Sequence, residues 1–389
     1  MIDGDWNDCA ARRQLVRDDA MGLIDHHGAR EQYIKWRIGR KSLDGRSLSE
    51  FYQIREFGKN QPDSYRFKTH LRPAIASNWH HHDGNGGDWD YVVAWIQDRE
   101  IWYAIVRDDD LTAPTILRIA QQPNAYTSFA PSVAVGPRLP NGRIQIVVAW
   151  KTRTGTIYLN GTDEYLDSFE VLESMEYDVL STPVVTYMPA EDRYILSFVM
   201  SGECQDYQCP DIECNRHSIA TIVSTDRYGD EWPTTATHYG SFISSPWQAP
   251  AMSCDSRDIY SPTNDFTDEC LMMYKQFRTP DTKWINQQGF KMNVTGLTLN
   301  AVLTDWETDD STYANLSLAS GDESWIYTFA QDSVGKSTMK YRIKPFWKGV
   351  GGDYRAFPTH ERNDMKSRVG FPVAYNYRTG LFVFVWHEH

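Results

Sequence analysis

A scattered set of arginine, histidine and aromatic residues is the part of this sequence best suited to binding a ligand. Each lies in a polar segment beside an apolar run. A planar guanidinium forms paired hydrogen bonds with carboxylates and hydroxyls, and an aromatic ring stacks on a ligand's apolar face. This chemistry suits a glycan or a protein ligand; the alternative for each residue is an ordinary surface position. The candidate ligand-binding residues are His70, Arg72, Arg99, Tyr126, Arg153, Trp247, Tyr313 and Arg368.

Two carboxylates, Asp98 and Asp178, occur in similar polar segments. Glycoside hydrolysis needs two carboxyl groups, one as general acid and the other as base or nucleophile. These two aspartates are therefore the candidate pair of a glycoside hydrolase. No sequence motif for a nucleophile or cofactor accompanies them, so a binding function without catalysis is the first expectation. Hydrolysis is the alternative.

The segment 80–88 is the one candidate metal site. Asp83, Asn85 and Asp88 offer oxygen ligands of the kind that calcium prefers. However, Gly87 occupies the third ligand position of the EF-hand spacing. The consecutive histidines of the segment would point in alternating directions on an extended loop, so they would rarely converge on one metal ion. The sequence therefore predicts a solvated loop and no cofactor, with calcium as the alternative.

The charge balance argues against nucleic acid and anionic membrane surfaces as partners. The chain has 389 residues, with 39 Lys and Arg against 52 Asp and Glu, which gives a net charge of −13. Proteins that bind duplex nucleic acid neutralise phosphates with a basic surface.

The longest apolar runs, 91–96 and 381–386, are about six residues long, whereas a membrane-spanning helix needs about 20. No membrane span is expected.

The cysteines point to an oxidising compartment. There are six of them, and Cys254 and Cys270 bracket an insertion rich in Ser, Asp, Thr and Pro. The even number of cysteines and their position around insertions predict disulfides in a secreted protein. Free buried thiols or a metal site are the alternatives, because Cys204, Cys209 and Cys214 are each separated by four residues. Cys254–Cys270 is the predicted pair, and the partners of Cys9, Cys204, Cys209 and Cys214 stay open. Since the first 25 residues contain no apolar signal region, we expect a mature protein or a fragment of one.

A short phrase recurs along the chain and predicts its architecture. It consists of Pro, two small or apolar residues and then Ala, Thr, Ser or Tyr, followed by a polar turn and an apolar strand. The phrases begin at Pro73, Pro131, Pro183, Pro250 and Pro372, with a proline-free version at Ala314. Repeats of several short strands are typical of a β-propeller, whereas a β-sandwich would not repeat the same phrase six times.

We therefore predict an all-β, six-bladed β-propeller over residues 31–389, with three strands recognisable in most repeats. The last repeat ends after two strands, at His389. Because an unpaired sheet edge is unfavourable, this last repeat needs further strands from elsewhere in the chain. The N-terminal segment 33–40 is the predicted partner of residues 381–386.

Residues 1–30 are predicted to form a short helical appendage. Leu15, Val16, Ala20, Leu23 and His27 have helical spacing. The segment resembles the last helix of matrixin-type zinc metalloprotease domains through Leu15, Asp18, Asp19, Gly22 and Leu23. That resemblance implies the C-terminal propeller of a longer secreted enzyme; an ordinary amphipathic helix is the alternative. The chain has no H-E-x-x-H motif, so it is not such a protease itself.

The segment 224–232 (STDRYGDEW) resembles the Asp-box of sialidases and related propellers, with one extra residue before Gly229. In that motif Asp and Ser fold a turn by bonding to the backbone, and Trp packs between blades. The resemblance implies a sialidase-like fold and says nothing of sialidase activity, because the family's Arg-Ile-Pro signature is missing and Arg72-Pro73 is the nearest match. A secreted binding module for a glycan or protein is therefore the preferred function, with a glycoside hydrolase as the alternative.

Overall fold

The computed structural model describes most of the chain as β-strands. The described residues are 32–387 apart from 43–46, 63–65, 82–83, 109–113, 178, 190, 202–216, 243–248, 255–268, 278–284, 296–297, 309–315, 322–323, 334–335, 346–354 and 357–370. They form 26 strands and one 3₁₀ turn, η3 (Trp79–His81). Among them no helix is long and apolar enough to cross a bilayer. The predicted helix within 1–30 lies outside the described residues.

Five sheets, here called the first to fifth blades, each contain four consecutive antiparallel strands. The first blade is β5 (Ala74–Ser77), β6 (Tyr91–Gln97), β7 (Glu100–Arg107) and β8 (Thr115–Tyr126). The second is β9 (Ser132–Arg138), β10 (Ile144–Lys151), β11 (Thr156–Asp163) and β12 (Glu170–Glu176), and the third is β13 (Val184–Met188), β14 (Arg193–Ser201), β15 (His217–Val223) and β16 (Thr237–Phe242). The fourth is β17 (Ala251–Cys254), β18 (Glu269–Phe277), β19 (Ile285–Thr295) and β20 (Thr298–Thr308), and the fifth is β21 (Ser317–Gly321), β22 (Ser324–Ser333), β23 (Lys336–Pro345) and β24 (Arg355–Ala356).

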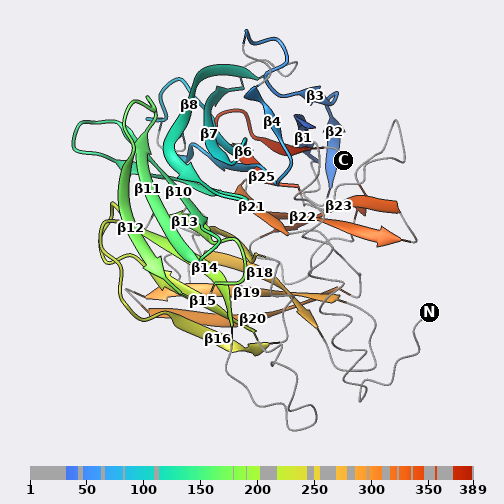
Figure 1. Ribbon diagram of the computed structural model, residues 1–389. Helices are drawn as coiled ribbons and strands as arrows, with labels where there is room; N and C mark the ends of the chain where they lie inside the picture. The colour runs from blue at the N-terminus through green and yellow to red at the C-terminus, as the bar shows by residue number, and fades with distance from the viewer. Residues whose placement is uncertain are drawn as a thin grey trace.

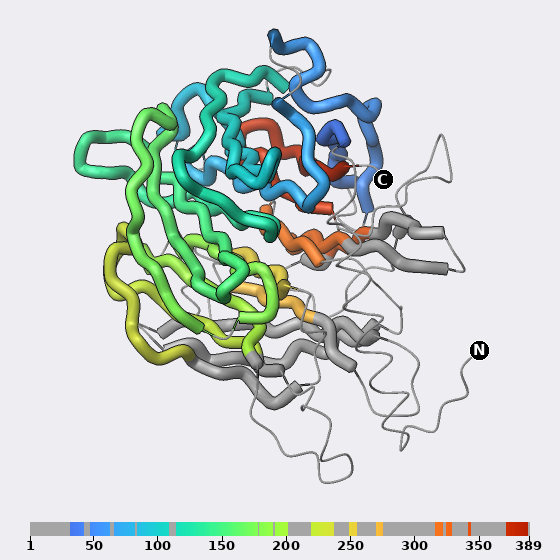
Figure 2. The backbone as a smooth tube through the Cα atoms, in the orientation of Figure 1, coloured from blue at the N-terminus to red at the C-terminus, as the bar shows by residue number. Residues whose placement is uncertain are grey.

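The remaining sheet, here called the closing sheet, joins the two ends of the chain. Its order is β2 (Leu48–Phe51), β1 (Gln32–Lys41), β26 (Leu381–His387) and β25 (Val373–Asn376), and β3 (Arg55–Glu56) and β4 (Lys68–Thr69) also pair with β1. The β1–β26 register runs from Ile34 opposite His387 to Arg40 opposite Leu381, which confirms the predicted pairing. The red C-terminal strands lie among the blue N-terminal ones (Figure 1, Figure 2).

Two features of the prediction need correction. The sequence predicted six blades, whereas the described residues form five blades of consecutive strands and one sheet of mixed origin. Each of the five also has four strands where the repeat suggested three. The fourth strands escaped notice because an outer strand buries little apolar surface: along β12 only one residue in seven is buried. A β-sandwich is also ruled out, since the strands do not form two stacked sheets.

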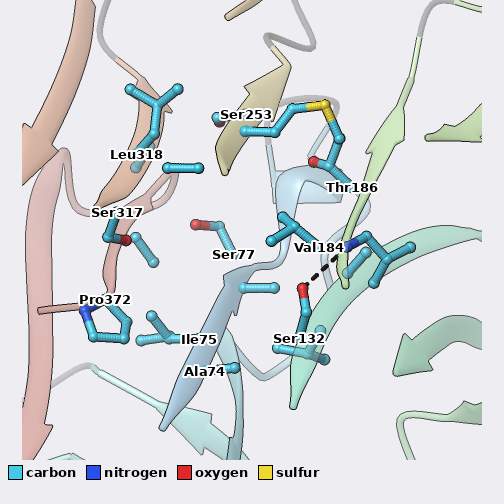
Figure 3. Close-up of a pocket in the computed structure, with 18 of the residues that line it drawn as sticks. Ala74, Ile75, Ser77, Ser132, Val184, Thr186, Ser253, Ser317, Leu318 and Pro372 are labelled. Atoms are coloured by element: carbon cyan, nitrogen blue, oxygen red, sulfur yellow. Dashed lines mark hydrogen bonds between the residues drawn. The ribbon is translucent and has the colours of Figure 1, made fainter. Parts of the chain in front are cut away.

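The five phrases that begin with proline mark the innermost strands of five sheets, whereas the proline-free phrase at Ala314 reaches the inner strand β21 only at its last residue, Ser317. The inner strands β5, β9, β13, β17, β21 and β25 contact one another in a closed ring. Proline precedes most of them, because the first residue of a strand tolerates a missing N–H. Serine hydroxyls link inner strands by accepting backbone N–H bonds: Ser132 from Val185 (3.0 Å), Ser253 from Ser320 (3.0 Å), Ser317 from Val373 (3.1 Å) and Ser77 from Tyr375 (3.0 Å). The four serines are labelled in Figure 3, which draws the bond of Ser132 as a dashed line.

The hydrophobic core lies between neighbouring sheets. The second strands β6, β10 and β26 are buried along their whole length, as continuous apolar runs bounded by turns predict. One cluster joins the closing sheet to the first blade, with Trp36 stacked on Phe57 at 5.4 Å and Phe67 stacked on Trp95 at 5.5 Å. Because each blade covers its neighbour's apolar face, the ring has to close to bury the core.

Two local predictions can be checked in the structure. Cys254 and Cys270 are paired residues of β17 and β18 and form a disulfide, which confirms that pair. Cys9, Cys204, Cys209 and Cys214 lie outside the described residues. In the segment 224–232, Asp226 accepts bonds from three backbone N–H groups, and Trp232 packs against the cluster shared by the second and third blades.

Candidate functional site

A cavity of about 150 Å³ runs along the axis of the ring and is lined by all the inner strands. Small side chains and hydroxyls face it, among them Ala74, Ser77, Ser132 and Thr186 (Figure 3). Its lining extends from residues that precede the inner strands to residues that follow them. The cavity therefore has two ends with different chemistry, one bearing a charged side chain and the other bearing aromatic rings.

Arg72 lies at the end where the chain enters the inner strands. Its Nη1 donates a hydrogen bond to the carbonyl oxygen of Leu316 at 3.0 Å, which ties the loop before β5 to the start of β21. Burial lowers the pKa of the Arg72 guanidinium to about 10. An adjacent carboxylate would raise this pKa, so the downward shift shows that desolvation dominates. The guanidinium is still protonated at neutral pH and would gain from an anionic group beside it.

Three more predicted residues come together at the end of the first blade. Asp98 and Arg99 form the tight turn between β6 and β7, and both are exposed. Tyr126 ends β8 opposite Glu100 and is 62% exposed. The N–H of Thr127 donates to the carbonyl oxygen of Arg99 at 2.8 Å, which fixes the loop to the turn. Asp98 is not among the residues that line the cavity.

The other predicted residues are spread more widely. His70 is half-buried in the loop before β5, and Arg153 is exposed in the turn between β10 and β11. Asn85 and Asp88 lie on an exposed loop. Among the described residues no group of three or more His, Cys, Asp or Glu could hold a metal ion. Asp83, Asp178, Trp247, Tyr313 and Arg368 lie outside the described part of the chain.

The opposite end of the cavity carries aromatic residues that sequence reasoning missed. Trp79 and Tyr187 stack with their ring centroids 5.7 Å apart, and both line the cavity together with Tyr377. The Trp79 indole N–H donates to the carbonyl oxygen of Val135 at 2.9 Å. The tryptophan follows a strand and precedes the histidines, and this position alone does not reveal that it reaches the axis.

A second missed feature is a buried carboxylate on the same side of the ring. Asp90 Oδ2 accepts a bond from the backbone N–H of Asp108 at 2.7 Å, and the His81 Nε2 lies 3.4 Å from Oδ1. Arg378, in the turn between β25 and β26, donates to both oxygens. Because the two partners are 288 residues apart, sequence spacing gives no signal for this contact.

Comparison with known proteins finds distant structural likeness only. No protein-family model matches the chain, and no curated protein matches it in sequence. Among solved structures, the GH93 alpha-L-arabinofuranosidase of Fusarium graminearum with arabinobiose is 10% identical at a TM-score of 0.44, over 82% of this chain and 92% of that one. The SapL1 lectin with alpha methyl fucoside is 13% identical at a TM-score of 0.45, over 78% and 84%. The Bombyx mori GH32 beta-fructofuranosidase BmSUC1 is 10% identical at a TM-score of 0.45, over 92% and 72%.

Proposed function

We propose that this chain is a secreted, non-catalytic module that binds an acidic glycan at the Arg72 end of the axial cavity. The observation that carries the proposal is the position of the Arg72 guanidinium. It lies at the cavity mouth, where burial lowers its pKa. A carboxylate or sulfate of a glycan would supply the opposite charge and accept paired hydrogen bonds.

The lining of the cavity fits the same type of ligand. Small residues such as Ala74 and Ala130 leave room at the mouth, and hydroxyl-bearing residues such as Thr182 and Ser317 lie beside them. Hydroxyl groups and a single cation suit a ligand rich in hydroxyls with an occasional acid. The Cys254–Cys270 disulfide supports an oxidising, extracellular setting.

A panel of acidic polysaccharides tests the proposal: polygalacturonate, alginate, hyaluronate, chondroitin sulfate, heparin and polysialate. We expect native protein to be retained by at least one of them and to release no reducing sugar from it. Arg72→Gln keeps a side chain able to donate to Leu316, and we expect it to weaken binding about tenfold or more. Arg55→Gln removes an exposed arginine of the closing sheet and is the matched control.

The outcomes separate the functions under consideration. Retention by none of the six polysaccharides overturns the proposal and leaves a protein ligand as the alternative. Steady release of reducing sugar without formation of an unsaturated uronate identifies a glycoside hydrolase. Loss of that release in Asp98→Asn would assign a catalytic role to the Asp98 carboxylate. Equal binding by native protein and Arg72→Gln places the ligand elsewhere. Whether the chain belongs to a longer secreted enzyme, as its N-terminal resemblance implies, is a separate prediction.

A further inference from the structure

Strained backbone is concentrated at one corner of the first blade. Asp98 and Arg99, with φ values of 53° and 67°, are both left-handed, and Asn124 in the adjacent strand has a φ of 60°. In a two-residue hairpin turn with positive φ at both positions, Asn-Gly is the favoured pair, because glycine adopts this conformation without steric strain. The chain instead keeps a carboxylate and a guanidinium there. Strain retained at such a position is typical of functional sites.

A large bulge in β8 places Tyr126 beside this turn. Tyr126 is paired with Glu100 and Gln121 with Trp102, so four residues of β8 (122–125) lie opposite the single residue Ile101 of β7, and three of them are extra. The bulge is anchored by Gln122 and Ala125, each 1% exposed, whereas Tyr126 is 62% exposed. Bulges often redirect a side chain near a functional site. Here the bulge presents an aromatic ring to solvent at the end of a strand.

The groups at this corner are those that recognise sugars. An exposed tyrosine ring stacks on the apolar face of a pyranose, and a guanidinium and a carboxylate bond to its hydroxyls. This corner provides the carboxylate of Asp98, the guanidinium of Arg99 and the ring of Tyr126. The bond from the Thr127 N–H to the Arg99 carbonyl oxygen holds the two backbone segments together. We call these three residues the first-blade corner.

The first-blade corner is connected to the cavity mouth by a fixed segment. The Thr127 hydroxyl donates to the carbonyl oxygen of Lys151 at 3.0 Å and accepts a bond from the N–H of Phe129 at 3.0 Å. The next two residues, Ala130 and Pro131, line the cavity. The segment therefore runs from the outer strand of the first blade to the axis, and a ligand that follows it contacts both places.

We propose that the first-blade corner is a second subsite, which binds a further sugar residue of the same glycan that Arg72 holds at the cavity mouth. This inference rests on the proposed function and deepens it, because it makes the ligand a polymer. A short fragment reaches only the mouth. A longer fragment also stacks on Tyr126 and therefore binds more tightly.

Fragments of two and eight sugar residues, prepared from the tightest-binding polysaccharide of the panel, test the inference by calorimetry. We expect native protein to bind the octasaccharide at least tenfold more tightly than the disaccharide. Tyr126→Ala should remove most of that difference and leave the disaccharide unaffected. Tyr165→Ala, at a tyrosine that is 47% exposed elsewhere on the protein, is the matched control and should bind both like native protein.

A double variant, Asp98→Asn with Arg99→Gly, separates binding from structure. It introduces the Asn-Gly turn, so we expect a higher melting temperature together with weakened octasaccharide binding. A higher melting temperature with unchanged octasaccharide binding would overturn the inference, as would equal affinities of native protein for both fragments. If Arg72→Gln weakens the binding of both fragments while Tyr126→Ala weakens the binding of neither, the second subsite is wrong and the proposed function stands. If no polysaccharide binds, both fail.

Discussion

Arg378 closes the ring by bonding to Asp90 across the junction between the closing sheet and the first blade. Its Nε donates to Asp90 Oδ1 at 2.9 Å and its Nη2 to Oδ2 at 2.5 Å. The Asp90 side chain is 0% exposed, whereas that of Arg378 is 38% exposed. The ion pair therefore joins the turn between β25 and β26 to the first blade, across the junction that closes the ring.

Loss of Arg378 should weaken this junction. Arg378→Gln removes the charge that faces a buried carboxylate, and we expect the free energy of unfolding to fall by about 1–3 kcal/mol. Urea denaturation at pH 7 measures it. Arg40→Gln breaks the exposed pair of Arg40 with Glu50, 3.5 Å apart, and should cost less than about 1 kcal/mol. Equal costs for the two variants would contradict a special role for the junction.

The pKa of Glu164 gives a pH dependence with a definite sign. Burial raises this pKa, and the nearby Asp163 carboxylate raises it further. Since the folded state holds the proton more tightly than the unfolded state, the stabilisation is present below the unfolded pKa and is lost as the pH rises through the folded one. Glu164→Gln should therefore stabilise the protein at pH 7 and have little effect at pH 4.

Thermal unfolding of native protein and Glu164→Gln across pH 4–7 measures this difference. Asp167→Asn, at an exposed carboxylate on the same loop, is the control for general charge effects. A constant difference between native protein and Glu164→Gln at all pH values would show that the Glu164 proton is not responsible.

The stability of the turn in segment 224–232 should depend on the Asp226 carboxylate. Its Oδ1 accepts bonds from the N–H groups of Asp230 at 2.9 Å and Glu231 at 3.0 Å, and its Oδ2 accepts one from Tyr228 at 2.8 Å. Asp226→Ala removes all three, and we expect a loss of about 1–3 kcal/mol in chemical denaturation. Asp226→Asn retains one acceptor oxygen and should lose less; a loss as large as that of Asp226→Ala would contradict this account.

The Cys254–Cys270 disulfide should stabilise the fourth blade. The two residues are 16 apart, and the chain-entropy model gives about 3 kcal/mol for a loop of this size. We expect a reductant to lower the melting temperature of native protein. Before reduction, the Cys254→Ala, Cys270→Ala double variant should have a lower melting temperature than native protein. Its melting temperature should also fall less when a reductant is added. Mass spectrometry that finds both thiols free in unreduced protein would refute the bond.

Much of the architecture follows from the sequence alone. The phrases at Pro73, Pro131 and Pro183 mark inner strands, because a strand that begins beside a crowded axis needs small residues and can dispense with its first N–H. The apolar runs 91–96 and 381–386 mark fully buried strands. The short last repeat predicts that 33–40 pairs with 381–386, since an unpaired edge is unfavourable. The boundary of the predicted appendage at residue 30 is still a prediction, which deletion of residues 1–28 would test.

Other features were decided only by the tertiary structure. The outer strands, such as β12, bury too little apolar surface to leave a hydrophobic pattern. The bond between Asp90 and Arg378 exists only because the ring brings the two ends of the chain together. The proximity of Tyr126 to Arg99 depends on a bulge in β8 within which Gln122 and Ala125 are buried. Local patterns in a sequence report local burial, whereas these contacts arise from the closure and packing of the whole ring.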